Sequence, residues 1–281
     1  MSKKYNLGSI SIPAAIIVSA AIIAIAIIIS LRPANRPVAV NNDATKAAQN
    51  QAVTINSRAI TAADHILGNP NAPVRIIEYS DPSCPFCKIF SPNIEKVMDT
   101  YGASGTVAWV YRSFPLDKPD SNGNVLHKNA GHESQALECA NEVGGNDKYW
   151  IFLKRLYEVT PSVTPQTPGG LDQAQLPVIA KFAGLDVKAF NDCLSSGRTS
   201  GKVDADYVDG INAGVNGTPF NVFVLSKPAS SAVDQALATT IIQMSLPSGS
   251  LFITSDRMKI GMSGAMPYET MKTLIDAILV R

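Results

Sequence analysis

The stretch that decides the fold is residues 74–87, VRIIEYSDPSCPFC. Its first six residues are rich in Ile and Val and lie between Pro73 and Pro82, so they predict a buried strand. Its last four are Cys-Pro-Phe-Cys, and the residues after them predict the start of a helix. Unpaired N–H groups and the helix dipole at such a start favour a thiolate. The spacing therefore predicts a reactive Cys84, with Cys87 able to close or resolve a disulfide.

A Cys-x-x-Cys motif also supplies half of many zinc sites. An all-cysteine site in this chain would need Cys139 and Cys193, which are far apart in the sequence. Structural zinc sites more often use two close pairs, so the spacing favours redox chemistry, and no metal is expected. His65, His127 and His132 show no metal-ligand spacing with one another. A metal-binding or metallochaperone module is the alternative of a different class.

Composition excludes several kinds of protein. The 281 residues include 24 Lys and Arg, 23 Asp and Glu, and four cysteines, for a net charge of +1. This balance excludes a strongly basic nucleic-acid-binding protein, so no nucleic-acid partner is expected. Four cysteines are too few for a disulfide-dense secreted scaffold. The length allows about two domains at most.

The N-terminal segment has the composition of a membrane span. Residues 7–31 carry no charge, and residues 14–29 are almost wholly Ile, Ala and Val. A helix of about 20 such residues crosses a bilayer. The run ends at Arg32-Pro33 without a small-x-small cleavage site, so residues 1–31 predict an uncleaved anchor rather than a signal peptide. Residues 32–57 predict a flexible tether, which leaves residues 58–281 for the folded domain.

Several motifs follow in order: DHILGNPNAPV at 64–74, IEYSD at 77–81, CPFC at 84–87, RSFPL at 112–116, GVNGTPF at 214–220 and GAMPYE at 264–269. Together they resemble the DsbA-like thiol-disulfide oxidoreductases of the thioredoxin superfamily. The resemblance implies an α/β thioredoxin fold, with a central mixed sheet flanked by helices and a helical subdomain inserted at about 125–200. It also implies disulfide formation or exchange in substrate proteins through a mixed disulfide.

The resemblance gives individual residues their roles. Cys84 is the nucleophile and Cys87 the resolving cysteine. Glu78 matches a buried acid that exchanges protons with the second cysteine, and a strand-edge Glu facing water is the alternative. Thr218 and Pro219 match a cis-proline loop that lies against the cysteines and binds an extended peptide, and an ordinary Gly-Thr-Pro turn is the alternative.

Pro85 and Phe86 lie between the cysteines, where they are expected to contact substrate. Strongly oxidising relatives carry His at the place of Phe86, and Phe cannot donate a hydrogen bond. The resemblance therefore implies a less stabilised Cys84 thiolate, for which Lys88 is a candidate compensating cation. Oxidase and reductase or isomerase directions both stay open. No cofactor beyond the redox-active cysteine pair is expected.

Helical periodicity predicts that the insertion is largely helical, and a further helical stripe is expected within 227–249. Relatives with cysteines matching Cys139 and Cys193 pair them, so the resemblance implies a structural disulfide, with two buried free thiols as the alternative. Stable disulfides imply an oxidising compartment. The domain is therefore expected on the periplasmic side of the cytoplasmic membrane. Its expected partners are cysteine-containing extracytoplasmic proteins and a membrane redox partner.

Overall fold

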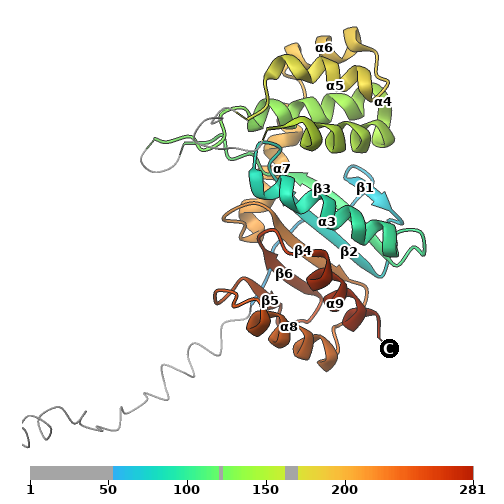
Figure 1. The fold of residues 1–281 in the computed structure, drawn as a ribbon, viewed down its shortest axis with the longest axis vertical. Helices are drawn as coiled ribbons and strands as arrows, with labels where there is room; N and C mark the ends of the chain where they lie inside the picture. Colours follow the sequence, from blue (N-terminus) through green and yellow to red (C-terminus); the bar gives the residue numbers. More distant parts are fainter. Residues whose placement is uncertain (1–52, 120–122, 162–169, 281) are drawn as a thin grey trace, which may run out of the picture. The chain divides into compact units, whose positions relative to one another are not determined.

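The computed structural model describes residues 53–119, 123–161 and 170–280, which are coloured in Figure 1. The predicted anchor at 1–31 lies outside the described residues. Among the described residues, no helix is both long enough and apolar enough to cross a membrane.

The predicted tether is wrong at its C-terminal end, because residues 53–57 pack on the domain. Val53 exchanges hydrogen bonds with Ser255, and the carbonyl of Ile55 accepts a hydrogen bond from Lys259 Nζ at 2.8 Å. The side chain of Ile55 is buried in an apolar cluster that includes Ile77. Burial of this one side chain ties the segment down within a sequence whose composition otherwise indicates a linker.

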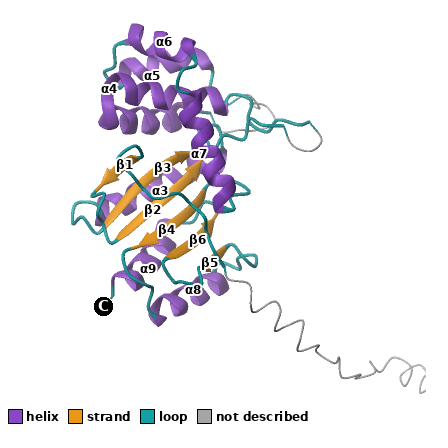
Figure 2. Cartoon of the chain, turned by 180° about the vertical axis from the view of Figure 1, so that it is seen from behind, coloured by secondary structure: helices purple, strands orange, loops and turns teal. Residues whose placement is uncertain are grey.

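The core of the domain is a six-stranded mixed sheet among the described residues, with the order β1-β3-β2-β4-β6-β5 (Figure 2). Only the β2 and β3 pair is parallel; the other neighbours are antiparallel. The strands are β1 His65–Gly68, β2 Val74–Ser80, β3 Val107–Ser113, β4 Phe220–Leu225, β5 Leu251–Ile253 and β6 Lys259–Ser263.

Helices cover both faces of the sheet. They are α3 Pro85–Tyr101, α4 Ala130–Val159, α5 Leu176–Phe182, α6 Val187–Ser196, α7 Ser200–Ala213, α8 Ser231–Gln243 and α9 Tyr268–Leu279, with a short 3₁₀ helix at Gln173–Gln175. Side chains of α3 and α9 share one apolar cluster with Ile76. Ala213 of α7 shares the other with Ile77. Because successive strand residues point to opposite faces, Ile76 and Ile77 are buried on opposite sides of β2, one in each apolar cluster.

Helices α4 to α7 connect β3 to β4, where the sequence predicts a helical insertion. Helix α4 is interrupted at Gly145, whose φ of 76° is a left-handed conformation that glycine adopts without steric cost. The extra segment at 227–249 contains α8, which packs against α9.

A disulfide joins Cys139 of α4 to Cys193 of α6, with an S–S distance of 2.02 Å, and both cysteines are buried. It closes a loop with a sequence separation of 54. Near it, the rings of Phe152 and Phe190 pack with centroids 5.4 Å apart. The bond therefore ties two helices of the insertion together within its apolar core.

Removing this disulfide is expected to destabilise the oxidised protein. In the loop-entropy model, a Cys139→Ser/Cys193→Ser variant loses about 4 kcal/mol of unfolding free energy, because its unfolded chain is no longer cross-linked. Urea unfolding of wild type and variant measures the difference. Under a strong thiol reductant the two curves should approach each other, and equal stability in oxidising buffer would contradict the prediction.

A buried charge network crosses the α7 face of the sheet. Arg112 of β3 is fully buried, and its guanidinium donates to Asp64 and to Asp209 of α7, both at 2.8 Å. The hydroxyl of Tyr79 also donates to Asp209. Burial alone raises the pKa of Asp64, but hydrogen bonds and charge from Arg112 bring that pKa below its usual value. The network holds the N-terminal segment, β3 and α7 together, and Arg58 adds a second guanidinium, which donates to Asp64 at 2.7 Å and to Asp206 at 2.8 Å.

Candidate redox site

Cys84 lies at the N-cap of α3, and Pro85 is the first residue of the helix. Its N–H donates to the carbonyl of Asp81 at 3.0 Å, which shapes the turn between β2 and α3. Its Sγ lies 3.5 Å from the carbonyl oxygen of Thr218. A hydrogen bond from Cys87 lowers the pKa of Cys84 to about 6, against an opposing effect of burial. The helix start thus holds a thiol that ionises near neutral pH.

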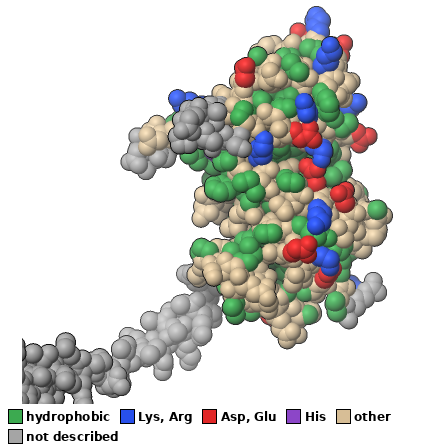
Figure 3. Space-filling model, in the orientation of Figure 1, with side chains coloured by type: hydrophobic (Ala, Val, Ile, Leu, Met, Phe, Trp, Pro, Cys, Tyr) green, Lys and Arg blue, Asp and Glu red, His purple; other side chains and the backbone are tan. Residues whose placement is uncertain are grey.

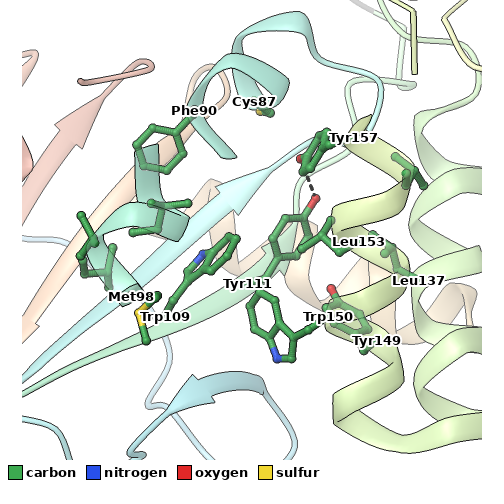
Figure 4. Close-up of a cluster of buried hydrophobic side chains, with 14 of the residues drawn as sticks. Cys87, Phe90, Met98, Trp109, Tyr111, Leu137, Tyr149, Trp150, Leu153 and Tyr157 are labelled. Carbon is green, nitrogen blue, oxygen red and sulfur yellow. Dashed lines mark hydrogen bonds between the residues drawn. The ribbon is translucent and has the colours of Figure 1, made fainter. Parts of the chain in front are cut away.

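Cys87 lies one turn into α3 and is fully buried. Its Sγ accepts a hydrogen bond from the N–H of Asp81 at 3.5 Å. Burial raises the pKa of Cys87 well above its usual value, and the charge of Cys84 raises it further. Figure 4 shows Cys87 near Phe90 and Tyr157, at the edge of an aromatic cluster. Of the two thiols, Cys84 is therefore the one that ionises first.

Glu78 is on the face of β2 that α3 covers, and only 1% of its surface is exposed. Its Oε2 accepts a hydrogen bond from Trp109 Nε1 at 2.9 Å. Burial raises the pKa of Glu78 to about 7, and the charge of Glu78 in turn contributes to the raised pKa of Cys87. The alternative of a strand-edge Glu that faces water does not hold, because Trp109 and the helix layer cover the carboxyl.

The raised pKa of Glu78 has a consequence for stability. The folded state binds the Glu78 proton more tightly than the unfolded chain, whose pKa is near 4.5, so this group's contribution falls as pH rises through about 7. Glu78→Gln removes that loss and keeps an acceptor for Trp109. We expect the free energy of unfolding of the variant, relative to that of wild type, to rise by roughly 3 kcal/mol between pH 4 and pH 8.5. Urea unfolding at both pH values measures the gain, and a pH-independent difference would contradict it.

The loop before β4 brings Thr218 and Pro219 to the cysteines, and the bond between them is cis. Strand β4 pairs with β2 so that Phe220 lies opposite Tyr79. The loop is therefore at the end of β2, beside the turn that leads to Cys84. The carbonyl of Pro219 accepts a hydrogen bond from the N–H of Gly264 at 2.9 Å, which joins this loop to the segment before α9.

An apolar rim adjoins the reactive cysteine. Phe86 is 60% exposed and Ile89 is 57% exposed, while Pro85 is partly buried. Exposed large apolar side chains beside a reactive group are typical of a binding surface. Figure 3 shows that the charged side chains of the visible face gather mainly toward its right-hand side.

Three residues near the cysteines were not identified from the sequence. Asp81 is fully buried, and its carboxylate contacts His127 Nδ1 at 2.8 Å. Glu133 of α4 is also fully buried and accepts a hydrogen bond from Ser83 Oγ at 2.7 Å. Asp81 directly follows the strand, which is a usable signal for a site residue. His127 and Glu133 lie on distant segments, and nothing in their spacing marks them.

Lys88 differs from its expected role as a compensating cation for Cys84. Its Nζ donates to the carbonyl oxygens of Glu158 and Thr160, at the C-terminal end of α4. A cation at that position pairs with the negative end of the helix dipole and with unpaired carbonyls. The charge of Lys88 thus stabilises the insertion rather than the Cys84 thiolate.

The disulfide between Cys139 and Cys193 uses two of the four ligands that an all-cysteine zinc site would need. In the described part of the chain, no group of three or more His, Cys, Asp or Glu side chains is arranged to hold a metal ion.

The strand, the dithiol helix and the cis-proline loop define a thioredoxin-fold protein with a cysteine pair at the start of a helix. A family model described as "Thioredoxin" matches residues 61–227, so the chain belongs to the thioredoxin family. The thioredoxin fold that the sequence resemblance implies is confirmed.

Solved structures with the same fold include alpha-DsbA1 of Wolbachia pipientis, with a TM-score of 0.56 and 22% identity over 78% of this chain and 92% of that chain. DsbA2 of Pseudomonas aeruginosa has a TM-score of 0.53 and 21% identity over 78% of this chain and 96% of that chain. These similarities show that the fold is DsbA-like.

Two kinds of curated relative match the chain. One is "Na(+)/H(+) antiporter NhaA 1" of Mycolicibacterium gilvum, 28% identical over 166 residues, which are 58% of this chain and 24% of that protein. Another is "Putative protein-disulfide oxidoreductase RP025" of Rickettsia prowazekii, 22% identical over 144 residues, which are 51% of this chain and 47% of that protein. The chain spans about a quarter of the Mycolicibacterium gilvum antiporter and about half of the Rickettsia prowazekii oxidoreductase.

Proposed function

We propose that this chain is a thiol-disulfide oxidoreductase that forms or exchanges disulfides in extracytoplasmic proteins through Cys84 and Cys87. The observation that carries the proposal is the placement of the two thiols at the start of α3: Cys84 is at the N-cap, with Sγ 3.5 Å from the Thr218 carbonyl, and Cys87 is fully buried. Their pKa values are shifted in opposite directions. One thiol with a low pKa and one buried thiol with a high pKa suit a two-step exchange, in which one cysteine meets the substrate and the other resolves it. The name of the Rickettsia prowazekii relative agrees with this chemistry.

In the oxidising direction, a substrate thiolate attacks Sγ of Cys84 in the Cys84–Cys87 disulfide. The S–S bond breaks, a mixed disulfide forms, and Cys87 leaves as a thiolate that takes up a proton. A second substrate thiolate then attacks the substrate sulfur of the mixed disulfide and releases Cys84 as a thiolate. The substrate loses two electrons, which the dithiol passes to a membrane redox partner. A reductase runs the same steps backwards.

Glu78 is the proton donor and acceptor for Cys87 in this scheme. Its pKa of about 7 lets it hold or release a proton near neutral pH, inside a site where Cys87 is shielded from water. Protonating the leaving Cys87 thiolate prevents two negative charges from being buried together, a state that burial makes unfavourable. Glu78 would thus act as a general acid during oxidation of substrate.

Thr218, Pro85 and Phe86 form the proposed peptide-binding surface around Cys84. The carbonyl of Thr218 lies 3.5 Å from the reactive sulfur, so a peptide bound along this loop would bring its own sulfur next to Cys84. Strand-like binding through backbone groups accepts many sequences. The exposed ring of Phe86 adds apolar contact without requiring a particular side chain.

We further propose that residues 1–31 anchor the domain in the cytoplasmic membrane, with the domain on the periplasmic side. The apolar run in the sequence supports an anchor, and the disulfide between Cys139 and Cys193 supports an oxidising compartment. Cysteine-containing extracytoplasmic proteins and a membrane redox partner would then be within reach. After brief reduction of intact cells, a membrane-impermeant maleimide should alkylate Cys84 on the periplasmic face, and labelling only after lysis would contradict the orientation.

Trapping the mixed disulfide tests the exchange mechanism. In a Cys87→Ser full-length chain, Cys84 can be linked to a substrate sulfur but no second thiol of the enzyme resolves it. We expect this variant to accumulate an adduct with a cysteine peptide supplied as its glutathione mixed disulfide, visible as a mass increase that a reductant reverses. The matched Cys84→Ser chain should form none. Equal adducts on both variants would contradict the assigned order of the cysteines.

A further inference from the structure

Two carboxylates, those of Asp81 and Glu133, contact Ser83, the residue before Cys84. The carboxylate of Asp81 accepts from the N–H of Ser83 at 2.7 Å and from the N–H of Leu116 at 2.8 Å. Glu133 accepts from the hydroxyl of Ser83 at 2.7 Å. The charge of Asp81 raises the pKa of Cys84, so this carboxylate opposes the thiolate. A cation beside Asp81 would therefore relieve this opposition and add to the effect of the Cys87 hydrogen bond on Cys84.

The motif itself does not provide that cation. Phe86 has no charge, and Lys88 is bound to carbonyls at the end of α4. Among the described side chains paired with Asp81, His127 alone can carry a positive charge, through Nδ1 at 2.8 Å from Oδ2.

His127 is held firmly against Asp81. Its side chain is 12% exposed. The backbone N–H of His127 donates to the backbone carbonyl of Leu116 at 3.0 Å, and the backbone N–H of Leu116 donates to the carboxylate of Asp81. The same carboxylate thus fixes both the loop and the imidazole. His127 comes from the segment before α4, so the insertion supplies it to the thioredoxin core.

We propose that His127 is a positioning residue of the redox site, whose imidazolium offsets the charge of Asp81 and thereby stabilises the Cys84 thiolate that the Phe86-containing motif leaves without a cation. This inference rests on the proposed function. It makes the oxidising strength of the Cys84–Cys87 pair depend on a residue contributed by the insertion, and it makes that strength depend on pH.

The charged groups around His127 act in the required direction. Burial lowers the pKa of His127, but the hydrogen bond and charge of Asp81 raise it above its usual value. The charges of Cys84 and Glu133 raise it further. Because the interaction between two charges is mutual, a Cys84 thiolate that stabilises the imidazolium is stabilised by it in return. Nearby Asp117 is also influenced by the charge of Asp81, and its own pKa is raised mainly by burial.

A stabilised Cys84 thiolate favours the reduced form and makes the disulfide more oxidising. In His127→Gln full-length protein, we expect the thiolate absorbance at 240 nm to titrate at a higher pH than in wild type. We also expect the equilibrium constant for oxidation of glutathione by the Cys84–Cys87 disulfide to fall by roughly three- to tenfold at pH 7. If His127 only supported the fold, its loss would not shift the thiolate titration and the equilibrium constant in a pH-dependent way.

The pH profile separates charge from structure. At alkaline pH, above the raised pKa of His127, the imidazole is neutral, so the equilibrium constants of wild type and His127→Gln should converge. His127→Lys keeps a cation and should retain an increased constant, relative to His127→Gln, at both pH values. His132→Gln is the matched control, because exposed His132 pairs with Gln173, and it should change the constant less than about twofold.

The outcomes separate the inference from the proposed function. A wild-type protein without reversible exchange would overturn both. Reversible wild-type exchange with unchanged values in His127→Gln would overturn only the role of His127. If His127→Gln does not fold, the His127→Lys variant decides. An equilibrium constant for His127→Lys no greater than that of wild type at alkaline pH would also overturn the inference.

Discussion

A Cys84→Ser variant is expected to lose disulfide exchange, with its rate falling to that of the uncatalysed reaction. Cys84 carries the thiol that ionises near pH 6 and meets the Thr218 loop, whereas the pKa of Cys87 is raised and its sulfur is buried. Serine at position 84 cannot form the mixed disulfide, and Cys87 cannot be reached by a protein substrate. Oxidation of a two-cysteine peptide by the pre-oxidised protein, followed by thiol alkylation and mass spectrometry, measures the loss.

The control for this experiment is the Cys139→Ser/Cys193→Ser variant, assayed below its unfolding transition. Its cysteine changes lie in the insertion between α4 and α6, so it should retain exchange when folded. Exchange that survives in Cys84→Ser but disappears in the control would contradict the assignment of the reactive pair.

An Arg112→Leu variant is expected to lose about 3–5 kcal/mol of unfolding free energy. The change removes the buried guanidinium that pairs with Asp64 and Asp209, and it leaves Arg58 as the remaining cationic partner of Asp64. The free energy of unfolding from urea titration at pH 7 measures the loss. The deficit should shrink at low pH, because Arg112 helps to hold the pKa of Asp64 below its usual value, and that contribution to stability is lost once Asp64 is protonated.

Arg155→Leu is a matched control for Arg112→Leu. Arg155 pairs with Glu158 on the surface of α4, where both side chains are more than a third exposed. A pair of that kind contributes less than about 1 kcal/mol. Equal losses of unfolding free energy in the two variants would contradict the prediction that the buried Arg112 network contributes more than a surface pair.

The sequence predicted the fold well because its signals are local and ordered. An Ile- and Val-rich strand followed by Cys-Pro-Phe-Cys identifies β2 and the start of α3, and motifs further along identify the proline loop and the start of α9. The tether boundary failed at residues 53–57 because Ile55 is held by contacts with residues far along the chain. A single apolar residue has no periodicity that would reveal such contacts.

The site was predictable only in part. Cys84, Cys87 and Glu78 lie on one strand-turn-helix segment, so their spacing brings them together. The burial of Glu78 depends on Trp109 in β3, and the contacts of Asp81 depend on His127 in a distant loop. Lys88 could not be assigned correctly because its partners are carbonyls at the end of α4, over 70 residues further along the chain. Electrostatics of this kind follow from tertiary packing, which no local pattern encodes.

The measurement that tests the central claim most directly is the redox equilibrium of the full-length protein with glutathione, read by alkylation of Cys84 and Cys87. The account predicts a reversible two-electron couple, with a potential roughly between −270 and −120 mV, the range of known thiol-disulfide oxidoreductases. Stoichiometric zinc bound tightly by the reduced protein, with no reversible couple, would contradict the account.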